Sequence, residues 1–253
     1  MNYTKAGTDD IAALRSLWRE AFADPDAYTD AFFKTVFPTC DAFCARDGAE
    51  LTAMLFALPQ TVCRAENDEK AAFLYAFAVK KAYQNQGIGT KLLEFAVKNL
   101  KKKYVSCIYL ACETERLADF YRKRGFYGKN ISRKTVLLPP AEGEAAVISA
   151  IDYAGLRETL LFDTPHIRHP KPFLDFLSQN AVFYRLQTKN AFGCACTERE
   201  NGRLKITECL PDASILPALA AALGSREAEL SDQTAQFLFF SEKEPPYCAF
   251  PLD

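Results

Sequence analysis

The stretch Leu74–Thr90, LYAFAVKKAYQNQGIGT, joins a strand pattern, a turn and the start of a helix pattern. Its first part is an apolar, aromatic-rich run that ends at Val79 and is typical of a buried strand. A short polar turn then leads to Gly87 and Gly89, where an amphipathic helix pattern begins. Backbone N–H groups converge at such a turn, and the helix dipole favours negative charge. The stretch therefore predicts an anion-binding element of the kind that holds phosphate groups.

Two common nucleotide motifs do not fit these glycines. A Walker A loop has the form G-x-x-x-x-G-K-[ST], and Gly87, Gly89 and Lys91 do not have that spacing. A dinucleotide fingerprint, G-x-G-x-x-G, needs a third glycine where this chain has Leu92. The glycines also open the third predicted helix, whereas that fingerprint opens the first. Another class of phosphate ligand is therefore expected.

A third pattern agrees with the sequence. Gln84-x-x-Gly87-x-Gly89 after an aromatic strand resembles the Q/R-x-x-G-x-G/A motif of the GNAT superfamily of acyl-CoA-dependent N-acyltransferases. Downstream, residues 120–126, FYRKRGF, are similar to that family's F-Y-x-x-x-G-F segment. The two motifs cover about Phe73 to Tyr127, and the predicted helix–helix–strand–strand lead-in agrees back to residue 8.

The resemblance implies a site for acetyl-CoA as co-substrate. The end of the motif strand would offer main-chain groups to the pantetheine arm, in a gap where the next strand splays away. The helix start would hold the pyrophosphate. The cofactor-binding residues that the resemblance implies are Phe77, Ala78, Val79, Gln84, Asn85, Gln86, Gly87, Ile88, Gly89, Thr90 and Thr114. Tyr121 is implied as the general acid that protonates the leaving thiolate.

Two positions depart from the pattern of the family. Many relatives carry an asparagine seven residues before the tyrosine, and here that residue is Thr114, which also suits a helix N-cap. Many carry a glutamate near the start of the motif strand as a general base, and here that residue is Phe73. The base is therefore open. The candidates are Glu113, Glu115, a carboxylate of the second half and Asp253, and an amine that binds in its neutral form needs no base.

The run Pro139–Glu144 has the composition of a linker. We predict a catalytic domain over residues 1–139 and a degenerate GNAT-like domain over residues 145–253. The fold class is α/β (α+β), each domain having a mixed, mainly antiparallel central sheet flanked by helices. The two halves show a similar order of predicted elements, with Lys134–Leu138 closing the first and Gln236–Phe240 ending the second. The layout is similar to that of bacterial acetyltransferases of the enhanced-intracellular-survival type.

The second half lacks the phosphate element. Its strand Leu204–Leu210 is followed by Pro211-Asp212-Ala213, without the glycine turn that a cofactor site would need. We therefore expect this half to bind no CoA. The pair His166 and His169 lies between prolines with no obvious cysteine or carboxylate set to complete a metal site, so no metal is expected.

The composition and charge of the chain argue against several other classes of protein. The formal net charge of -1 leaves no basic surplus, so nucleic acid is not the expected partner. The acidic N-terminus is unlike a signal peptide, and the apolar runs are far shorter than the roughly 20 residues of a membrane span. The odd number of cysteines, nine, indicates reduced thiols in a cytoplasmic protein. Nothing in the sequence indicates the oligomeric state.

The motifs together predict an acetyl-CoA-dependent N-acetyltransferase. The acceptor would be a primary amine of a small molecule, a peptide or a protein. A non-enzymatic acyl-CoA-binding sensor is the alternative, because the glutamate base of many relatives is missing. The two hypotheses differ in whether bound acetyl-CoA is turned over.

Overall fold

The computed structural model describes residues 1–112, 114–128, 133–200, 202–224, 227–231 and 237–248. The helices are α1 (Ile11–Phe22), α2 (Asp26–Thr35), α3 (Ile88–Lys102), α4 (Glu115–Arg122), α5 (Ala150–Leu160), α6 (Lys171–Leu177) and α7 (Leu216–Leu223). The strands are β1 (Asn2–Lys5), β2 (Asp41–Asp47), β3 (Glu50–Cys63), β4 (Glu69–Val79), β5 (Cys107–Ala111), β6 (Tyr127–Gly128), β7 (Arg133–Leu137), β8 (Glu144–Ile148), β9 (His166–Arg168), β10 (Ala181–Gln187), β11 (Phe192–Glu200), β12 (Arg203–Leu210), β13 (Glu227–Ser231) and β14 (Phe237–Ser241).

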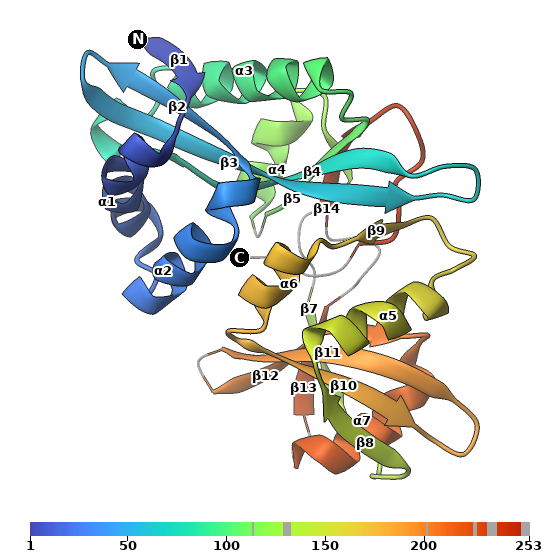
Figure 1. Ribbon diagram of the computed structural model, residues 1–253. Helices are drawn as coiled ribbons and strands as arrows, with labels where there is room; N and C mark the ends of the chain where they lie inside the picture. The colour runs from blue at the N-terminus through green and yellow to red at the C-terminus, as the bar shows by residue number, and fades with distance from the viewer. Residues whose placement is uncertain (113, 129–132, 201, 225–226, 232–236, 249–253) are drawn as a thin grey trace.

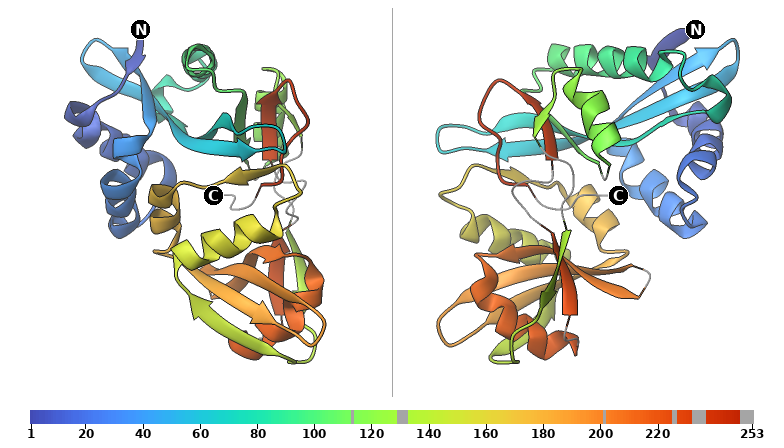
Figure 2. Two further views of the ribbon diagram at one scale, coloured as in Figure 1. Left: turned by 45° about the vertical axis from the view of Figure 1, so that its right-hand side comes forward. Right: turned by 180° about the vertical axis from the view of Figure 1, so that it is seen from behind.

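The first sheet has the strand order β1-β2-β3-β4-β5-β14-β6, with β9 added on β3. Strands β4 and β5 run parallel and are joined through α3, while the other pairs are antiparallel. Helices α1 and α2 cover one face, and α3 and α4 lie on the opposite face (Figures 1 and 2). The sheet is therefore the middle layer of a helix–sheet–helix arrangement.

The second sheet has the order β7-β13-β12-β11-β10-β8. Here β12 and β13 are the parallel pair, and α7 joins them as α3 joins β4 to β5. The predicted fold class, two mixed and mainly antiparallel sheets flanked by helices, is confirmed. The resemblance between the halves lies in this shared layout.

The two sheets exchange strands, which the sequence did not indicate. Strand β7 follows the first half but pairs with β13 in the second sheet. Strand β14 follows β13 but pairs with β5 and β6 in the first sheet (Figure 2, right). The expectation that Lys134–Leu138 closes the first half is therefore wrong, as is the assignment of the last strand to the second half. The predicted division into residues 1–139 and 145–253 does not coincide with the two sheets.

A hydrophobic cluster runs through both halves. Trp18, Phe32 and Phe56 of the first half and Phe173 and Phe176 of the second are buried in the same cluster. Phe176 of α6 packs on Phe32 of α2, with ring centroids 5.7 Å apart. Because this core is continuous, the second half supports the face of the first sheet that α1 and α2 cover.

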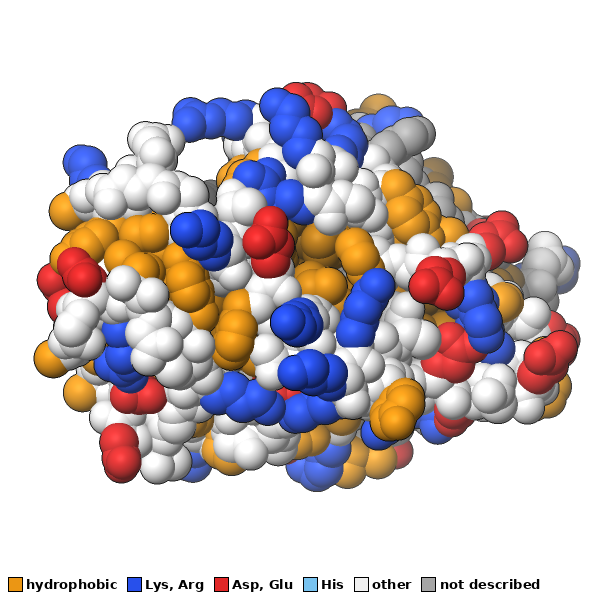
Figure 3. Space-filling view, turned by 90° about the horizontal axis from the view of Figure 1, so that it is seen from above, with side chains coloured by type: hydrophobic (Ala, Val, Ile, Leu, Met, Phe, Trp, Pro, Cys, Tyr) orange, Lys and Arg blue, Asp and Glu red, His pale blue; other side chains and the backbone are white. Residues whose placement is uncertain are grey.

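Helix α3 packs its apolar face against the first sheet and turns its polar face to solvent. Its apolar positions, among them Leu92 and Ala96, are fully buried against the other face of the first sheet. The lysines of its polar face are exposed, as is typical of an amphipathic surface helix. Lys and Arg side chains gather in the middle of the face seen from above (Figure 3).

All nine cysteines lie among the described residues, and none forms a disulfide. Eight are buried, including Cys194 and Cys196 in the shared core, so most of the thiols are packed in the interior. No helix in the described ranges is long and apolar enough to cross a membrane.

Candidate active site

Strand β4 carries an irregularity beside the site. Its pairing with β3 passes from Phe56↔Tyr75 to Met54↔Ala78, which leaves one extra residue in β4. At this bulge Ala76 has φ +46°, a left-handed conformation that residues other than glycine seldom adopt. The bulge re-aims the end of β4, where the sequence predicts contacts to a pantetheine arm.

Strands β4 and β5 separate just before the bulge. Their parallel pairing covers only Ala71 to Phe73 of β4, and it ends at Phe73↔Tyr109. A cavity of about 270 Å³ is lined by Leu74–Phe77 of β4 and by Leu110 and Ala111 of β5. The predicted gap between the motif strand and the next strand is therefore present in the structure.

The glycine turn and the N-terminus of α3 line a second, larger cavity of about 810 Å³. Asn85 and Gly87 have φ of +61° and +77°. Left-handed and right-handed backbone conformations therefore alternate along the turn, which is a pattern found in anion-binding backbone sites. A Cβ on Gly89 would lie 3.3 Å from Val79 Cγ2, which is tight against the end of β4. The described lining is Phe77, Val79, Tyr83, Gln84, Asn85, Gly87, Ile88, Gly89, Thr90, Thr114, Arg116, Leu117, Phe120, Tyr121 and Arg124.

Two of the predicted cofactor residues lie outside this lining. Ala78 is buried in the shared core, because its side chain points to the face opposite to that of Phe77 and Val79. Gln86 is exposed, and its Nε2 donates to the carbonyl of Ala82 at 3.2 Å. The other predicted residues all contribute to the wall of the larger cavity.

Arg124 is a residue of this wall that sequence reasoning missed. Its Nη2 donates to Thr90 Oγ1 at 2.5 Å, and its guanidinium lies 3.7 Å from the ring centroid of Phe120. Its Nε is buried and has no hydrogen-bond partner among the described residues. A cationic group with an unused donor, beside a helix N-terminus, suits a polyphosphate ligand. The cavity thus fits the phosphates of CoA.

Tyr121 lies where the two cavities meet. Phe77, Thr114, Leu117 and Tyr121 line both of them. Burial raises the pKa of the Tyr121 phenol, and the neighbouring Cys112 adds to the shift. The phenol is therefore neutral at physiological pH and can donate a hydrogen bond or a proton at this junction.

Thr114, which departs from the family pattern, and the candidate bases lie in different surroundings. Thr114 is the N-cap of α4, since its Oγ1 accepts from the N–H of Leu117 at 3.3 Å. Glu115 lines neither cavity and is paired with Arg122. Glu113 and Asp253 lie outside the described residues. No described carboxylate of the second half lines either cavity.

One carboxylate that was not among those candidates does line the smaller cavity. Asp24 follows α1 and lies in the cavity wall with Trp18 and Phe22. Trp18 Nε1 donates to Asp24 Oδ2 at 2.8 Å, which fixes the carboxylate. In the sequence Asp24 looks like a helix-breaking residue before Pro25, and no local signal marks it as a site residue.

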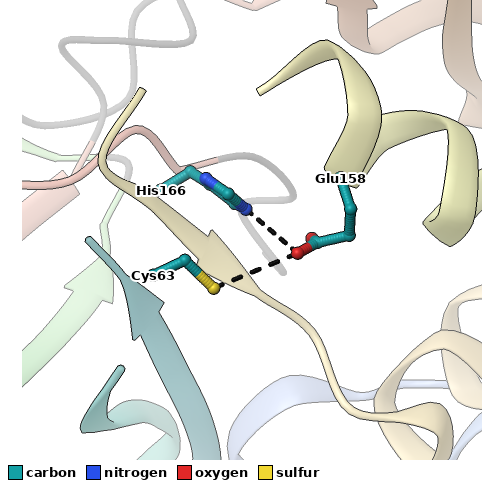
Figure 4. Close-up of side chains that lie close together, drawn as sticks. All are labelled: Cys63, Glu158 and His166. Carbon is teal, nitrogen blue, oxygen red and sulfur yellow. Dashed lines mark hydrogen bonds and ion pairs between the residues drawn. The ribbon is translucent and has the colours of Figure 1, made fainter. Parts of the chain in front are cut away.

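A group of potential metal ligands lies away from both cavities. Cys63, Glu158 and His166 point toward one another (Figure 4), so the expectation that no such set surrounds His166 is wrong. His166 Nε2 and Arg168 Nε lie 3.2 and 3.1 Å from the same oxygen, Glu158 Oε2. Burial by itself would raise the pKa of the Glu158 carboxyl. The attraction of His166 and of the nearby arginines is stronger, so the net effect is a lowered pKa. Because a guanidinium already neutralises this carboxylate, we interpret the group as a polar link between β3, α5 and β9. The absence of a metal stays a prediction.

The turn that follows β12 differs from the one that follows β4. It begins at a cis peptide bond to Pro211, and Asp212 Oδ1 accepts from the N–H of Ser214 at 2.8 Å. The turn therefore lacks the glycine-rich backbone that lines the larger cavity. That the second half binds no CoA stays a prediction.

The fold and the two joined cavities define the class of protein. The sequence model of the acetyltransferase (GNAT) family matches residues 11–126. This part of the chain is therefore a GNAT acetyltransferase domain, a family that takes acetyl-CoA as co-substrate. The predicted enzyme class, an acetyltransferase, is confirmed at this level.

Solved structures with both halves resemble the chain in fold. A probable N-acyltransferase from Enterococcus faecalis V583 has a TM-score of 0.72 at 14% identity, covering 94% of this chain and 72% of that one. A putative acetyltransferase from Pyrococcus horikoshii has a TM-score of 0.62 at 17% identity, covering 96% and 89%. Eis1 from Mycobacterium abscessus has a TM-score of 0.61 at 12% identity, covering 91% and 65%. Among curated proteins the sequence comparison finds no match.

Proposed function

We propose that this protein transfers the acetyl group of acetyl-CoA to a primary amine, with Tyr121 as general acid. The observation that carries the proposal is the meeting of the two cavities at Tyr121. The larger cavity has the phosphate-binding features, and the smaller one extends from the separated strands, where the pantetheine arm would end, to Trp18, Phe22 and Asp24 on the α1 side. A thioester held at their junction would face an amine from the smaller cavity.

Acetyl-CoA supplies the acyl group in activated form, as a thioester. The N-terminus of α3 and Arg124 hold the phosphates, and the end of β4 orients the arm. When the amine forms the N–C bond, the C–S bond breaks and the electron pair goes to sulfur. Tyr121 donates its proton, or a hydrogen bond, to that sulfur. The nitrogen that has formed the amide bond releases one proton to solvent, and a phenol that has given up its proton is reprotonated from solvent. Positioned groups of this kind contribute about 10²–10⁴-fold in rate.

The test separates the enzyme from the acyl-CoA sensor. CoA binding is measured by calorimetry, and thiol release from acetyl-CoA is then followed with a panel of amines that includes a polyamine, an aminoglycoside and a peptide. We expect binding and amine-dependent release. Binding without release from any amine would favour the sensor, to which the buried apolar Phe73 in place of a glutamate also points. A chain that does not bind CoA would exclude both functions.

The glycine turn gives a prediction with a matched control. Gly87 and Gly202 have φ of +77° and +79°, and a Cβ at either would meet no atom within 4 Å. Valine imposes a similar backbone strain at both positions, but only Gly87 lines the larger cavity. We expect Gly87→Val to weaken CoA binding at least about tenfold, because the strained turn no longer directs its N–H groups together. Calorimetry should show that Gly202→Val binds like the wild type, and equal losses in both would contradict the role of the turn.

Arg124 gives a second prediction on the same ligand. Arg124→Gln removes the cation beside the α3 N-terminus, so we expect the affinity for CoA to fall about tenfold at low salt. The difference from the wild type should shrink as salt rises, since screening weakens the lost attraction. Arg122→Gln is the control, because Arg122 pairs with Glu115 and Asp119 on the same helix and lines neither cavity. A salt-independent loss would argue against phosphate binding by Arg124.

A further inference from the structure

We propose that the smaller cavity binds a primary amine carried by a compact apolar group, and that Asp24 is the residue that binds its ammonium. This inference rests on the proposed function, because it takes the smaller cavity as the acceptor side. It adds the chemical class of the acceptor and a specificity-determining residue. Three features of the cavity carry it: a fixed carboxylate, an otherwise uncharged wall and a small volume.

The carboxylate of Asp24 is fixed by its surroundings. Ala23, at φ +55°, ends α1 in a left-handed conformation, and Pro25 opens α2, so Asp24 sits in a tight corner between the helices. Its partner Trp18 is 1% exposed and packs on Phe32, with the two ring centroids 4.8 Å apart. The bond from Trp18 uses Oδ2, while Oδ1 accepts no hydrogen bond from the described residues. One carboxylate oxygen is thus held and the other is available to a cation.

The rest of the described wall carries no charge. Apart from Asp24 it consists of apolar and aromatic side chains, the Cys112 thiol and the hydroxyls of Thr114, Tyr75 and Tyr121. Two large apolar residues of this wall, Phe22 and Leu117, are 41% and 48% exposed. Exposed apolar side chains around a concave site are typical of ligand recognition. They favour an amine whose carbon part is hydrophobic.

One carboxylate in an apolar wall can neutralise one cation. A polyamine or an aminoglycoside brings several, and the additional charges would lose water without gaining a partner. The volume of about 270 Å³ is also smaller than the cavities of roughly 300–1,000 Å³ that hold drug-sized ligands. A monoamine such as 2-phenylethylamine therefore fits better than spermidine or kanamycin.

Binding can be measured without turnover. Trp18 is the single tryptophan of the chain and lines the cavity, so its fluorescence reports on an amine beside Asp24. We expect 2-phenylethylamine to change this fluorescence with a Kd at least about tenfold lower than that of spermidine. Binding of 2-phenylethylamine without thiol release would leave the inference standing and overturn the proposed function. Thiol release with tighter binding of spermidine or kanamycin would do the reverse.

The role of Asp24 has its own variant. Asp24→Asn keeps the acceptor for the Trp18 N–H but removes the charge, so we expect KM for 2-phenylethylamine to rise at least about tenfold, with a smaller change in kcat. Asp24→Glu should recover part of the loss. Asp26→Asn is the control, because Asp26 is an exposed residue of the same corner, paired with Arg19, and lines neither cavity. An unchanged KM in Asp24→Asn, or the same rise in Asp26→Asn, would overturn the assignment.

Discussion

Replacing Tyr121 with phenylalanine is expected to lower kcat for thiol release by about 10²-fold, while the affinity for CoA stays within about threefold of the wild type. The substitution removes only the hydroxyl, and the ring keeps its packing against Phe77 and Phe126. The loss should therefore fall on the step in which the departing sulfur needs a proton. Single-turnover thiol release at saturating acetyl-CoA measures that step.

The control for this variant is Tyr127→Phe. Tyr127 follows on the same segment, lines neither cavity, and donates from its hydroxyl to the carbonyl of Lys243 at 3.0 Å. It should keep full activity. If Tyr121→Phe also kept full activity, the general-acid role would be excluded, although the cavity could still bind the cofactor.

The pH dependence of the same variant follows from the position of the phenol. Burial raises the pKa of Tyr121 above its ordinary value of about 10, and the group is protonated at every pH below that pKa. The proton needed by the sulfur is therefore present throughout the neutral and mildly alkaline range. Wild type and Tyr121→Phe should show kcat profiles of the same shape up to about pH 9, offset by a constant factor. A basic limb that disappears in the variant would mean that Tyr121 titrates in this range.

Replacing Glu208 with glutamine or alanine is expected to destabilise the protein by about 3–5 kcal/mol, the usual cost of leaving a buried charge without its partner. Arg157 and Glu208 are 2% and 0% exposed, and Arg157 Nε lies 3.0 Å from both carboxylate oxygens. Arg157 Nη1 also donates to the carbonyl of Ile167 at 2.6 Å, which ties α5 to β9. Burial alone would lower the pKa of Arg157, but Glu208 and other neighbours reverse that shift. A guanidinium is always charged in proteins, so Arg157 would be left as a buried charge when Glu208 is removed.

Urea unfolding at neutral pH measures the effect of Glu208. Asp175→Asn is the control, because the pair Lys171–Asp175 is exposed and such pairs contribute about 0–1 kcal/mol. A Glu208→Gln variant as stable as the control would mean that Arg157 finds other partners. Because β9 pairs with the first sheet, the loss should appear in the unfolding of both halves as one transition.

Local patterns were sufficient to locate the strand, the turn and the helix that line the larger cavity. The end of β4, the glycine turn and the start of α3 are contiguous in the chain, so strand, turn and helix signals could be read directly. The separation of the next strand, which the family resemblance implied, is also present, and Tyr121 lies in the wall of the cavity there. The strand, the turn and the helix start depend on residues close together in sequence, whose backbone preferences the residue types express.

The acceptor side depends on contacts that no local pattern expresses. Asp24 reaches the cavity because Trp18 packs in a core built from α1, α2, β3 and β4. Arg124 reaches the larger cavity because the segment after α4 lies beside the α3 N-terminus, where Thr90 accepts its hydrogen bond. A carboxylate before a proline and an arginine before a glycine look like ordinary helix ends in the sequence.

The sequence by itself thus determined the class of the first half and the positions of its glycine turn and its tyrosine segment, because neighbouring residues form each of these motifs. Only the tertiary structure decided which sheet each closing strand joins. Strands β7 and β14 have the composition of strands, but β-propensity does not specify a partner. Pairing is settled by which sheet offers an open edge within reach, and here each half completes the sheet of the other. The same long-range packing brings Asp24 to the cavity and Glu158 to Cys63 and His166.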